Sequence, residues 1–488
     1  MANGFCMGKL RIPVLLLLFA TAAVMEATRL SSLSTLSTSD IWMHLASGLW
    51  ILKNHAVPRS GIFSQASASA WVDTSWWFDV KAALLYRMIG LRAIPVIAMS
   101  LKTLLAIVTF LLGGGLRGRF WPAAALSAVV QYVLGGVQPG PTYVSLFFFA
   151  VELILLFESR STGKDRLLYW LPALFLVWAN FDDQFVYGIG CLVLFLGRLA
   201  WEGRARAGTS SLLKTAGTCA ALSVITSFVT PYFWRPYGVF FARFTSAAAQ
   251  HMPDYEAMRF HQPQDYVLLL LAMAAFFSLG LRRSRDVFQI ALLAGCAVLA
   301  FHSQRDTWLV ALAAVAVVGQ QIASVKSLPT KDTENTEECT GFKTIAGCAA
   351  IAIAVVVVAA FTLIPNNGEA LLARIGQAYP VKAGDYIREH QLPQPLFNAF
   401  EWGGFLAWYL PGYPVAIDGR TGPYDDEFVN QYAKAMNAEI PYTQFSAMAS
   451  AQTLLLQKKS VMGQALANVP AFRVAYSDDV AIVLTRQP

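Results

Sequence analysis

The first three quarters of the chain alternate between long apolar runs and short polar connectors. Each run is close to the ~17–25 residues that a helix needs to cross a bilayer. The runs are residues 11–28, 93–114, 121–138, 142–158, 167–182, 184–201, 212–230, 266–281, 287–302, 306–323 and 344–364. The pattern predicts an all-α polytopic membrane domain of about 11 transmembrane helices over residues 1–364, with a large first external loop at 29–92.

The last part of the chain has a different pattern. Short strand-like runs alternate with helical stretches, which is typical of a small α/β domain. The strand-like runs are residues 395–397, 414–417, 473–476 and 480–484, and the clearest helical stretches are 383–390 and 441–455. We therefore expect a small C-terminal α/β domain over residues 365–488.

Basic residues are concentrated in every second connector. The N-terminus and five alternate connectors hold 17 Lys and Arg residues, whereas the other short connectors hold one, Arg305. Cytoplasmic loops carry an excess of Lys and Arg. The N-terminus is therefore expected in the cytoplasm of a multi-pass protein of the inner or plasma membrane, and the C-terminal domain is expected outside.

Composition supports a membrane protein. The hydrophobic residues make up 56% and the charged residues 14% of 488 positions, whereas a soluble domain carries about 25% charged residues. The net charge of +7 comes from residues dispersed between apolar segments. That distribution indicates a lipid bilayer rather than nucleic acid as the partner.

The first external segment carries the sharpest candidate chemistry. Asp40, His44 and Trp42 stand on one short predicted helix. One interpretation is a helix lying on the membrane surface, capped by its acid and with Trp at the interface. The other is a catalytic site, in which Asp40, one turn from His44, accepts a proton from an acceptor hydroxyl or binds a metal. Asp73 and Asp79 follow near the next helix, where we expect them to cap it or to be solvated.

A second candidate site lies in the tail. Trp402-Gly403-Gly404 precedes Asp418-Gly419-Arg420, which follows a short apolar run. Opposite charges at a strand end suit a ligand site for substrate or phosphate, and paired glycines allow close approach. The same residues could equally form a turn closed by a salt bridge.

Two short turns on the same predicted side hold further candidates. Asp182 and Asp183 could bind a divalent metal, Mg or Mn, together with Asp40, or could be a plain turn. Arg305 could hold a lipid phosphate as a bidentate donor, or pair with Asp306. Within the apolar runs, Lys102 and Glu152 lie at similar predicted depth with opposite charge, which suggests an ion pair.

At these residues the chain resembles a family. The run Asp40-x-Trp42-x-His44-Leu45-x-x-Gly48, followed by Trp76-Trp77, is similar to the first external loop of GT-C-type membrane glycosyltransferases. The tail run from Trp402 to Arg420 and the middle run Trp178-Ala179-Asn180 are similar to the same set, an uncharacterised bacterial group resembling the dolichyl-phosphate-mannose protein mannosyltransferases.

The resemblance implies transfer of a sugar from a polyprenyl-phosphate-linked donor to a glycan or protein acceptor on the extracytoplasmic face, by an inverting mechanism. Asp40 would be the base, and a cation or basic side chain would take the phosphate. Two alternatives remain open. One is a non-catalytic subunit that keeps the fold and binds a partner through its external domain. The other is a transporter, for which the chain lacks visible repeats.

Overall fold

The computed structural model describes residues 10–487 except 32–39, 67–69, 118, 206–209, 246–254, 326–341, 364–367 and 421–422. The chain divides into two compact units. Unit 1 comprises Met1–Ala27, Val96–Trp234 and Met252–Ala360, and unit 2 comprises Thr28–Pro95, Arg235–His251 and Phe361–Pro488. The first external segment thus folds with the tail in one unit.

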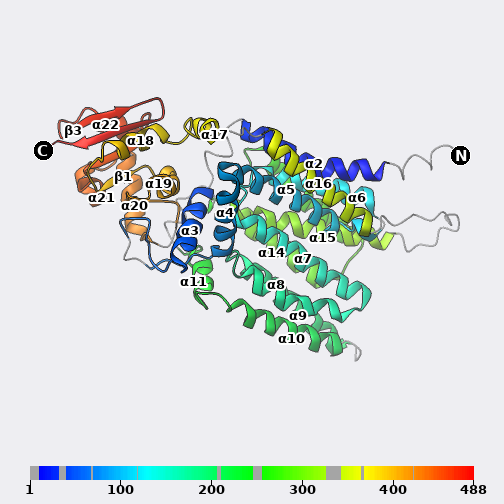
Figure 1. Cartoon of the computed structure of the whole chain (residues 1–488). Helices are drawn as coiled ribbons and strands as arrows, with labels where there is room; N and C mark the ends of the chain where they lie inside the picture. Colours follow the sequence, from blue (N-terminus) through cyan, green and yellow to red (C-terminus); the bar gives the residue numbers. More distant parts are fainter. Residues whose placement is uncertain are drawn as a thin grey trace. The chain divides into compact units, whose positions relative to one another are not determined.

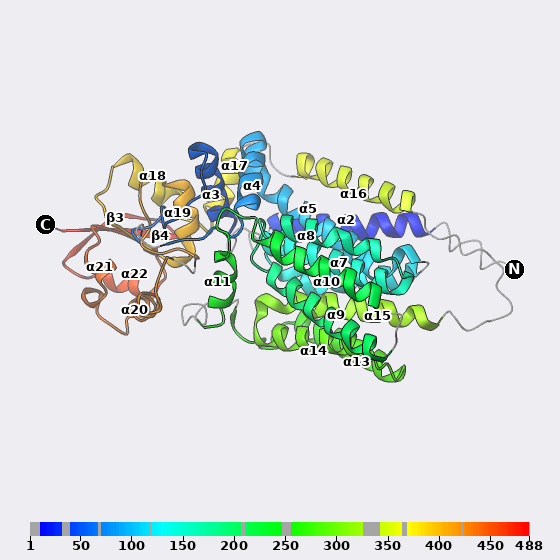
Figure 2. The ribbon, with the colours of Figure 1, turned by 90° about the horizontal axis from the view of Figure 1, so that it is seen from below.

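Unit 1 is built almost entirely from helices, and each of the eleven apolar runs overlaps one of them. In both views helices α7 to α10, α14 and α15 run side by side (Figures 1 and 2). The helices are α2 (Arg11–Ser31), α5 (Ala93–Leu112), α6 (Phe120–Val133), α7 (Pro141–Thr162), α8 (Leu171–Trp178), α9 (Phe185–Ala205), α10 (Ser210–Ser227), α13 (Pro263–Leu281), α14 (Val287–His302), α15 (Thr307–Val325) and α16 (Phe342–Leu363). The 3-10 turns η2 (Gly115–Arg117), η3 (Leu134–Gly136), η4 (Asp165–Trp170) and η7 (Gln304–Asp306) connect them.

Several helices are suited to a membrane. Within the described residues, four stretches are long and apolar enough to cross one: Trp76–Leu112, Pro141–Thr162, Phe185–Glu202 and Pro263–Leu281. Five shorter apolar helices accompany them: Arg11–Thr21, Phe120–Gly136, Leu212–Ser227, Val287–His302 and Ala346–Val356. The protein is thus a mostly helical integral membrane protein with several candidate spans.

Local sequence explains where these helices begin and end. Pro141 starts α7 at its first position, where a missing N–H costs nothing, and Gly163 ends it with a φ of 65°. Gln262 and Asp265 form a reciprocal capping box on α13. The side chain of Asp286 accepts hydrogen bonds from the Phe288 and Gln289 backbone N–H groups and caps α14.

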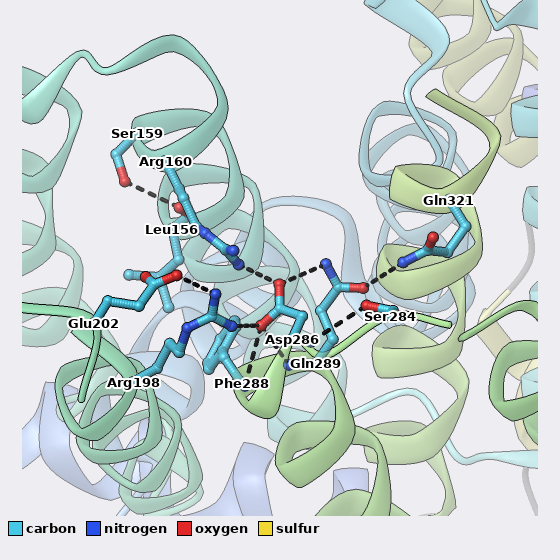
Figure 3. A network of polar contacts seen from close by, with 10 residues as sticks. All are labelled: Leu156, Ser159, Arg160, Arg198, Glu202, Ser284, Asp286, Phe288, Gln289 and Gln321. Carbon is cyan, nitrogen blue, oxygen red and sulfur yellow. Dashed lines mark hydrogen bonds and ion pairs between the residues drawn. The ribbon is translucent and has the colours of Figure 1, made fainter. Parts of the chain in front are cut away.

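A network of charged residues ties α7, α9 and α14 together (Figure 3). Arg160 of α7 and Arg198 of α9 both pair with the Asp286 carboxylate. The Gln289 amide also donates to Asp286 at 3.0 Å, and Gln321 of α15 donates to Gln289 at 2.9 Å. The buried acid therefore has two cations and a complete set of donors, as a buried charge requires.

The predicted Lys102–Glu152 pair is wrong. Lys102 Nζ donates to the Gly135 carbonyl at 3.3 Å, while neither carboxylate oxygen of Glu152 has a hydrogen-bond partner among the described residues. Glu152 instead approaches Gly188, where an added Cβ would lie 2.6 Å from its Oε2. A similar predicted depth along two helices does not fix the direction in which each side chain leaves its helix.

Unit 2 combines the first external segment with the tail. Its helices are α3 (Ile41–Asn54), α4 (Trp76–Ile89), α11 (Arg235–Ala242), α17 (Gly368–Ile375), α18 (Val381–Glu389), α19 (Gly403–Tyr409), α20 (Asp426–Met436), α21 (Ser446–Ala449) and α22 (Val461–Leu466), with 3-10 turns η1 (Gly90–Arg92), η8 (Phe400–Trp402) and η9 (Tyr442–Gln444). Helix α3 packs closely on α4 because Gly48 has no side chain: a Cβ there would collide with the Asp79 carbonyl.

The tail forms a four-stranded mixed sheet in the order β1-β2-β4-β3. The strands are β1 (Leu396–Asn398), β2 (Thr453–Gln457), β3 (Phe472–Ser477) and β4 (Ala481–Arg486). Strand β1 is parallel to β2, whereas β4 is antiparallel to both of its neighbours. The tail therefore contains a small mixed sheet with short helices, while residues 365–488 as a separate domain stay a prediction.

Two predicted elements of the tail are wrong. The helix expected over residues 441–455 is replaced by η9, α21 and the start of β2. Residues Leu454 to Leu456 are fully buried, and a short apolar run buried on both faces cannot be told from a helix by its periodicity. Residues 414–417 form no named strand and make only an isolated bridge from Val415 to Ser64.

Candidate active site in the first external segment and the tail

Helix α3 is buried rather than laid on a surface. Trp42 is 1% exposed, and its ring packs against the rings of Tyr379, Phe405 and Trp408. Helix α3, with the sequence IWMHLASGLWILKN, is apolar on most sides, and it can therefore pack against both α4 and α19. The surface-lying interpretation with an interfacial Trp42 is therefore wrong.

Asp40 stands at the start of α3 but does not cap it. Its side chain makes no capping hydrogen bond, and its backbone is helical, with a φ of −67° and a ψ of −2°. Asp40 is exposed, and its Oδ1 lies 3.4 Å from the position a Cβ of Gly419 would take. The fold thus brings Asp40 against the Asp418-Gly419-Arg420 loop.

Arg420 is held by Asp418 in a bidentate ion pair. Nε donates to Oδ1 at 2.9 Å and Nη2 donates to Oδ2 at 2.6 Å. The guanidinium lies over the rings of Trp71, at 4.6 Å, and Phe63, at 5.5 Å. Tyr424 also donates to Asp418, at 3.0 Å. The turn closed by a salt bridge is what these residues form.

The charge balance in this loop is nearly complete. Burial lowers the pKa of Arg420, but the Asp418 carboxylate outweighs it and the net effect is a raised pKa. Within the described residues, one nitrogen of Arg420, Nη1, is buried without a hydrogen-bond partner. That N–H is the group with which Arg420 could donate to an anion.

The side chain of Trp402 is packed inside unit 2. The side chain is 3% exposed, and its Nε1 donates to the Ala378 carbonyl at 3.2 Å. The glycines after it allow close approach: a Cβ on Gly403 would collide with the Ile417 carbonyl, and one on Gly404 would touch Met43. The Trp402-Gly403-Gly404 run therefore seats α19 between α3 and the Asp418 loop.

A buried polar cluster lies between α3 and α4. His44 Nδ1 is 2.7 Å from Asp79 Oδ1, and Ser47 Oγ donates to Asp73 Oδ2 at 2.5 Å. Ser75 lies between them, with its Oγ 3.5 Å from both His44 Nδ1 and Asp73 Oδ1. Asp73 and Asp79 are 2% and 1% exposed.

The expectation that Asp73 and Asp79 cap or are solvated is wrong. Asp73 does accept a hydrogen bond from the Ser75 backbone N–H at 3.3 Å, but both acids are buried. Burial, and then the charge of Asp79, raise the pKa of Asp73 well above its usual range. One signal was present in the sequence: Asp79 stands inside the run Trp77-Phe78-Asp79-Val80, and an acid that such a run buries needs a partner.

A second cluster, in unit 1, gathers the remaining candidates. Asp182 and Asp183, in the turn between α8 and α9, are each 3% exposed. Ser145 donates to Asp182 at 2.7 Å and itself accepts from Trp178 Nε1 at 2.7 Å. Burial and the neighbouring Asp183 raise the pKa of Asp182 to about 7. The pair is therefore a buried part of the fold rather than a solvated turn.

Arg305 belongs to the same cluster. Its Nη1 donates to the Tyr255 hydroxyl at 2.8 Å. Burial lowers the pKa of Arg305, but Tyr255, Asp183, Asp182 and Asp306 together raise it. One guanidinium thus faces three carboxyl groups, and any phosphate bound there would meet an excess of negative charge.

The donor set for a metal is incomplete. Across the described residues, no three His, Cys, Asp or Glu side chains gather in a group that could hold a metal ion. Asp182 and Asp183 are in unit 1 and Asp40 is in unit 2. A Mg or Mn site shared by these three residues stays a prediction.

Comparisons with known proteins show which solved structures have a similar fold. No protein-family model and no curated protein matches the chain. Among solved structures, ArnT from Cupriavidus metallidurans bound to undecaprenyl phosphate matches with a TM-score of 0.50 at 13% identity, over 99% of this chain and 98% of that one.

An archaeal enzyme matches as well. The apo oligosaccharyltransferase of Archaeoglobus fulgidus has a TM-score of 0.52 at 12% identity, over 91% of this chain and 69% of that one. The archaeal oligosaccharyltransferase AglB from Archaeoglobus fulgidus, in complex with an inhibitory peptide and a dolichol-phosphate, has a TM-score of 0.52 at 10% identity, over 90% of this chain and 69% of that one. The chain therefore has a fold similar to that of GT-C glycosyltransferases, whereas the mannosyltransferase-like subgroup stays a prediction.

Proposed function

We propose that this protein is an integral-membrane glycosyltransferase that takes its sugar from a polyprenyl-phosphate-linked donor. The fold resembles proteins whose structures contain undecaprenyl phosphate or dolichol-phosphate. The observation that carries the proposal is the position of Asp40. An exposed carboxylate at the start of α3 lies beside the Asp418-Gly419-Arg420 loop, which joins both motifs of the family resemblance in one compact unit.

In the proposed reaction the acceptor hydroxyl oxygen attacks the anomeric carbon of the donor. The bond from that carbon to the phosphate oxygen breaks, and the configuration inverts. Asp40 takes the hydroxyl proton as general base, which typically contributes ~10²–10⁴-fold. The polyprenyl phosphate leaves with the bonding electrons. Either Arg305, through its half-buried guanidinium, or Arg420, through Nη1, stabilises its charge.

The two arginines differ in their surroundings. Arg305 faces three carboxyl groups, so a phosphate there would need a divalent cation bound nearby. Arg420 faces one carboxylate, with which it is already paired. A conservative test is Arg305→Lys against Arg420→Lys, because lysine keeps the charge but loses bidentate geometry. The variant that raises the KM for donor identifies the phosphate partner.

The proposed sidedness places the chemistry outside. About eleven spans with a cytoplasmic N-terminus put the C-terminal domain on the extracytoplasmic face. Ser446 is exposed in unit 2, so an engineered Ser446→Cys should react in intact cells with a thiol reagent that cannot cross membranes. Protection of that cysteine until the cells are lysed would reverse the assignment.

The central experiment compares matched aspartate variants in lipid nanodiscs. Undecaprenyl phosphate binding is measured by native mass spectrometry, and transfer is measured with a panel of radiolabelled undecaprenyl-phosphate sugars. Asp40→Asn should lose at least ~10²-fold in transfer while it retains undecaprenyl phosphate binding. Asp479→Asn, an equally exposed acid of unit 2, should keep both. Full transfer by Asp40→Asn would remove Asp40 as the base.

The alternative is a non-catalytic subunit that binds a partner through unit 2. It is favoured by the inward packing of the tail motif, since Trp402 is buried and Arg420 is already paired with Asp418. Under this alternative the wild-type protein transfers none of the sugars. Two results together would establish this alternative. The wild-type protein would be inactive, and a membrane enzyme would co-purify with the wild type but not with variants substituted in unit 2.

A further inference from the structure

The cluster between α3 and α4 contains two buried acids, and within the described residues neither of them pairs with a Lys or Arg side chain. Asp73 and Asp79 lie within hydrogen-bonding reach of each other. Across the described residues, their ion pairs are limited to the one that joins Asp79 to His44. Two carboxylates sharing a buried site cannot both ionise readily, so one of them holds a proton.

The contacts distinguish the two acids. Asp73 accepts hydrogen bonds from Ser47 Oγ and Ser75 Oγ, and the Asp79 carboxylate beside it can accept the proton of a neutral Asp73 carboxyl group. Asp79 has its Oδ1 against the imidazole Nδ1 of His44 at 2.7 Å. This arrangement assigns the proton to Asp73 and the negative charge to Asp79.

The position of His44 connects the buried acids to the proposed base. Asp40 and His44 are four residues apart on α3, and such residues share a helix face. Exposure decreases inward from this face: Asp40 is exposed, the His44 side chain is 18% exposed, and the side chain of Asp79, on α4, is 2% exposed. A carboxylate behind a histidine fixes which ring nitrogen carries the proton.

We propose that Asp79, with Asp73 behind it, is a positioning residue that fixes the His44 imidazole with its proton on Nδ1. The second nitrogen, Nε2, is then the atom that accepts the proton Asp40 has taken from the acceptor. The imidazolium that forms is stabilised by the Asp79 carboxylate and returns the proton to solvent. The catalytic part of this inference rests on the proposed transfer reaction, whereas the tautomer does not.

The tautomer can be measured directly without a variant. Met43-His44 is the only Met-His pair in the sequence, so labelling with carbonyl-¹³C methionine and ¹⁵N histidine identifies His44 by solid-state NMR among the six histidines. We expect the wild-type imidazole to carry its proton on Nδ1 near neutral pH. A neutral ring protonated at Nε2 would overturn the proposal, whether or not transfer is ever observed.

Two matched variants then separate positioning from packing. Asp79→Asn presents an amide to His44 and should move the proton to Nε2, with kcat reduced ~10²–10⁴-fold and KM nearly unchanged. Asp73→Asn imitates the neutral carboxyl group and should leave the tautomer unchanged, with kcat within about tenfold. An unchanged tautomer in Asp79→Asn, or equal kcat losses in both variants, would contradict the assigned roles. If Asp79→Asn does not fold, the wild-type spectrum still decides.

Discussion

Two buried aspartates, Asp286 in unit 1 and Asp79 in unit 2, show two solutions to one physical problem. Asp286 pairs with Arg160 and Arg198 and caps α14. Asp79 contacts His44 and has a second acid, Asp73, beside it. A buried charge with complete compensation is expected in a structural element, whereas an arrangement that shifts protonation equilibria is typical of functional sites.

The comparison has a geometric side as well. The Asp286 network joins helices α7, α9, α14 and α15, so its loss affects the whole helical unit (Figure 3). The Asp79 cluster lies at one contact, between α3 and α4, next to the exposed Asp40. The predictions that follow test whether the first network is structural and the second is functional.

The largest expected loss of stability comes from Asp286→Ala. The change removes the helix cap and leaves two arginines without their carboxylate, and breaking a buried pair typically costs ~3–5 kcal/mol. Partial exposure of Arg160 brings the expected value to about 3 kcal/mol. It would be measured as a fall in the thermal midpoint in detergent.

The control for Asp286 is Glu202→Gln. Glu202 pairs with the same Arg198, but as an i,i+4 neighbour at the edge of the network. Such pairs contribute about 0.3–0.5 kcal/mol. Equal losses in the two variants would show that Asp286 is no more than a surface charge.

The next prediction concerns the contact that forms the Asp79 cluster. A Cβ at Gly48 would collide with the Asp79 backbone and approach Ala83, so Gly48→Ala should force α3 away from α4. Overpacking of this kind costs about 1–3 kcal/mol. Gly412→Ala is the control, because its Cβ would meet nothing within 4 Å. We expect a lower thermal midpoint, and lower transfer, only in Gly48→Ala.

The sequence predicted the helical part of the fold well and the site in part. An apolar run is a local property, so each predicted run overlaps a helix. The position of Asp40 beside Gly419 and the pairing of Asp79 with His44 depend on tertiary contacts, such as the one at Gly48, that no local pattern contains. For the same reason depth alone wrongly paired Lys102 with Glu152.

The stability of the wild type should fall as pH rises, because a carboxyl group with a raised pKa binds a proton in the folded state. Burial raises the pKa of Asp73, so the folded state binds a proton that the unfolded state releases near pH 4. Stability from this group is therefore present at acid pH and is lost as pH rises above about 4. Asp182, with a pKa of about 7, acts in the same direction up to about pH 7. Thermal midpoints of the wild type should fall between pH 5 and 7.

Single variants test which carboxyl groups cause the thermal midpoint to fall as pH rises. Asp73→Asn and Asp182→Asn should each flatten the dependence, because an amide does not titrate, while Asp479→Asn should leave it unchanged. A wild-type midpoint that rises between pH 5 and 7 would mean that ionised carboxylates dominate both clusters.

The smallest expected effect is a gain in stability at Glu152. Both carboxylate oxygens of Glu152 are buried and have no hydrogen-bond partner in the part of the chain that the structure describes. Replacing such a group with an apolar one of similar shape is neutral or stabilising. Glu152→Met should therefore raise the free energy of unfolding by up to about 1 kcal/mol, which would be measured as a higher thermal midpoint. Glu158→Met is the matched change on the same helix, where the carboxylate pairs with Arg117, and it should lower the midpoint slightly, since half-exposed pairs contribute about 0–1 kcal/mol. A loss of stability in Glu152→Met would show that the buried carboxyl group has a partner in the membrane, and would place it with Asp79 rather than with the purely structural residues.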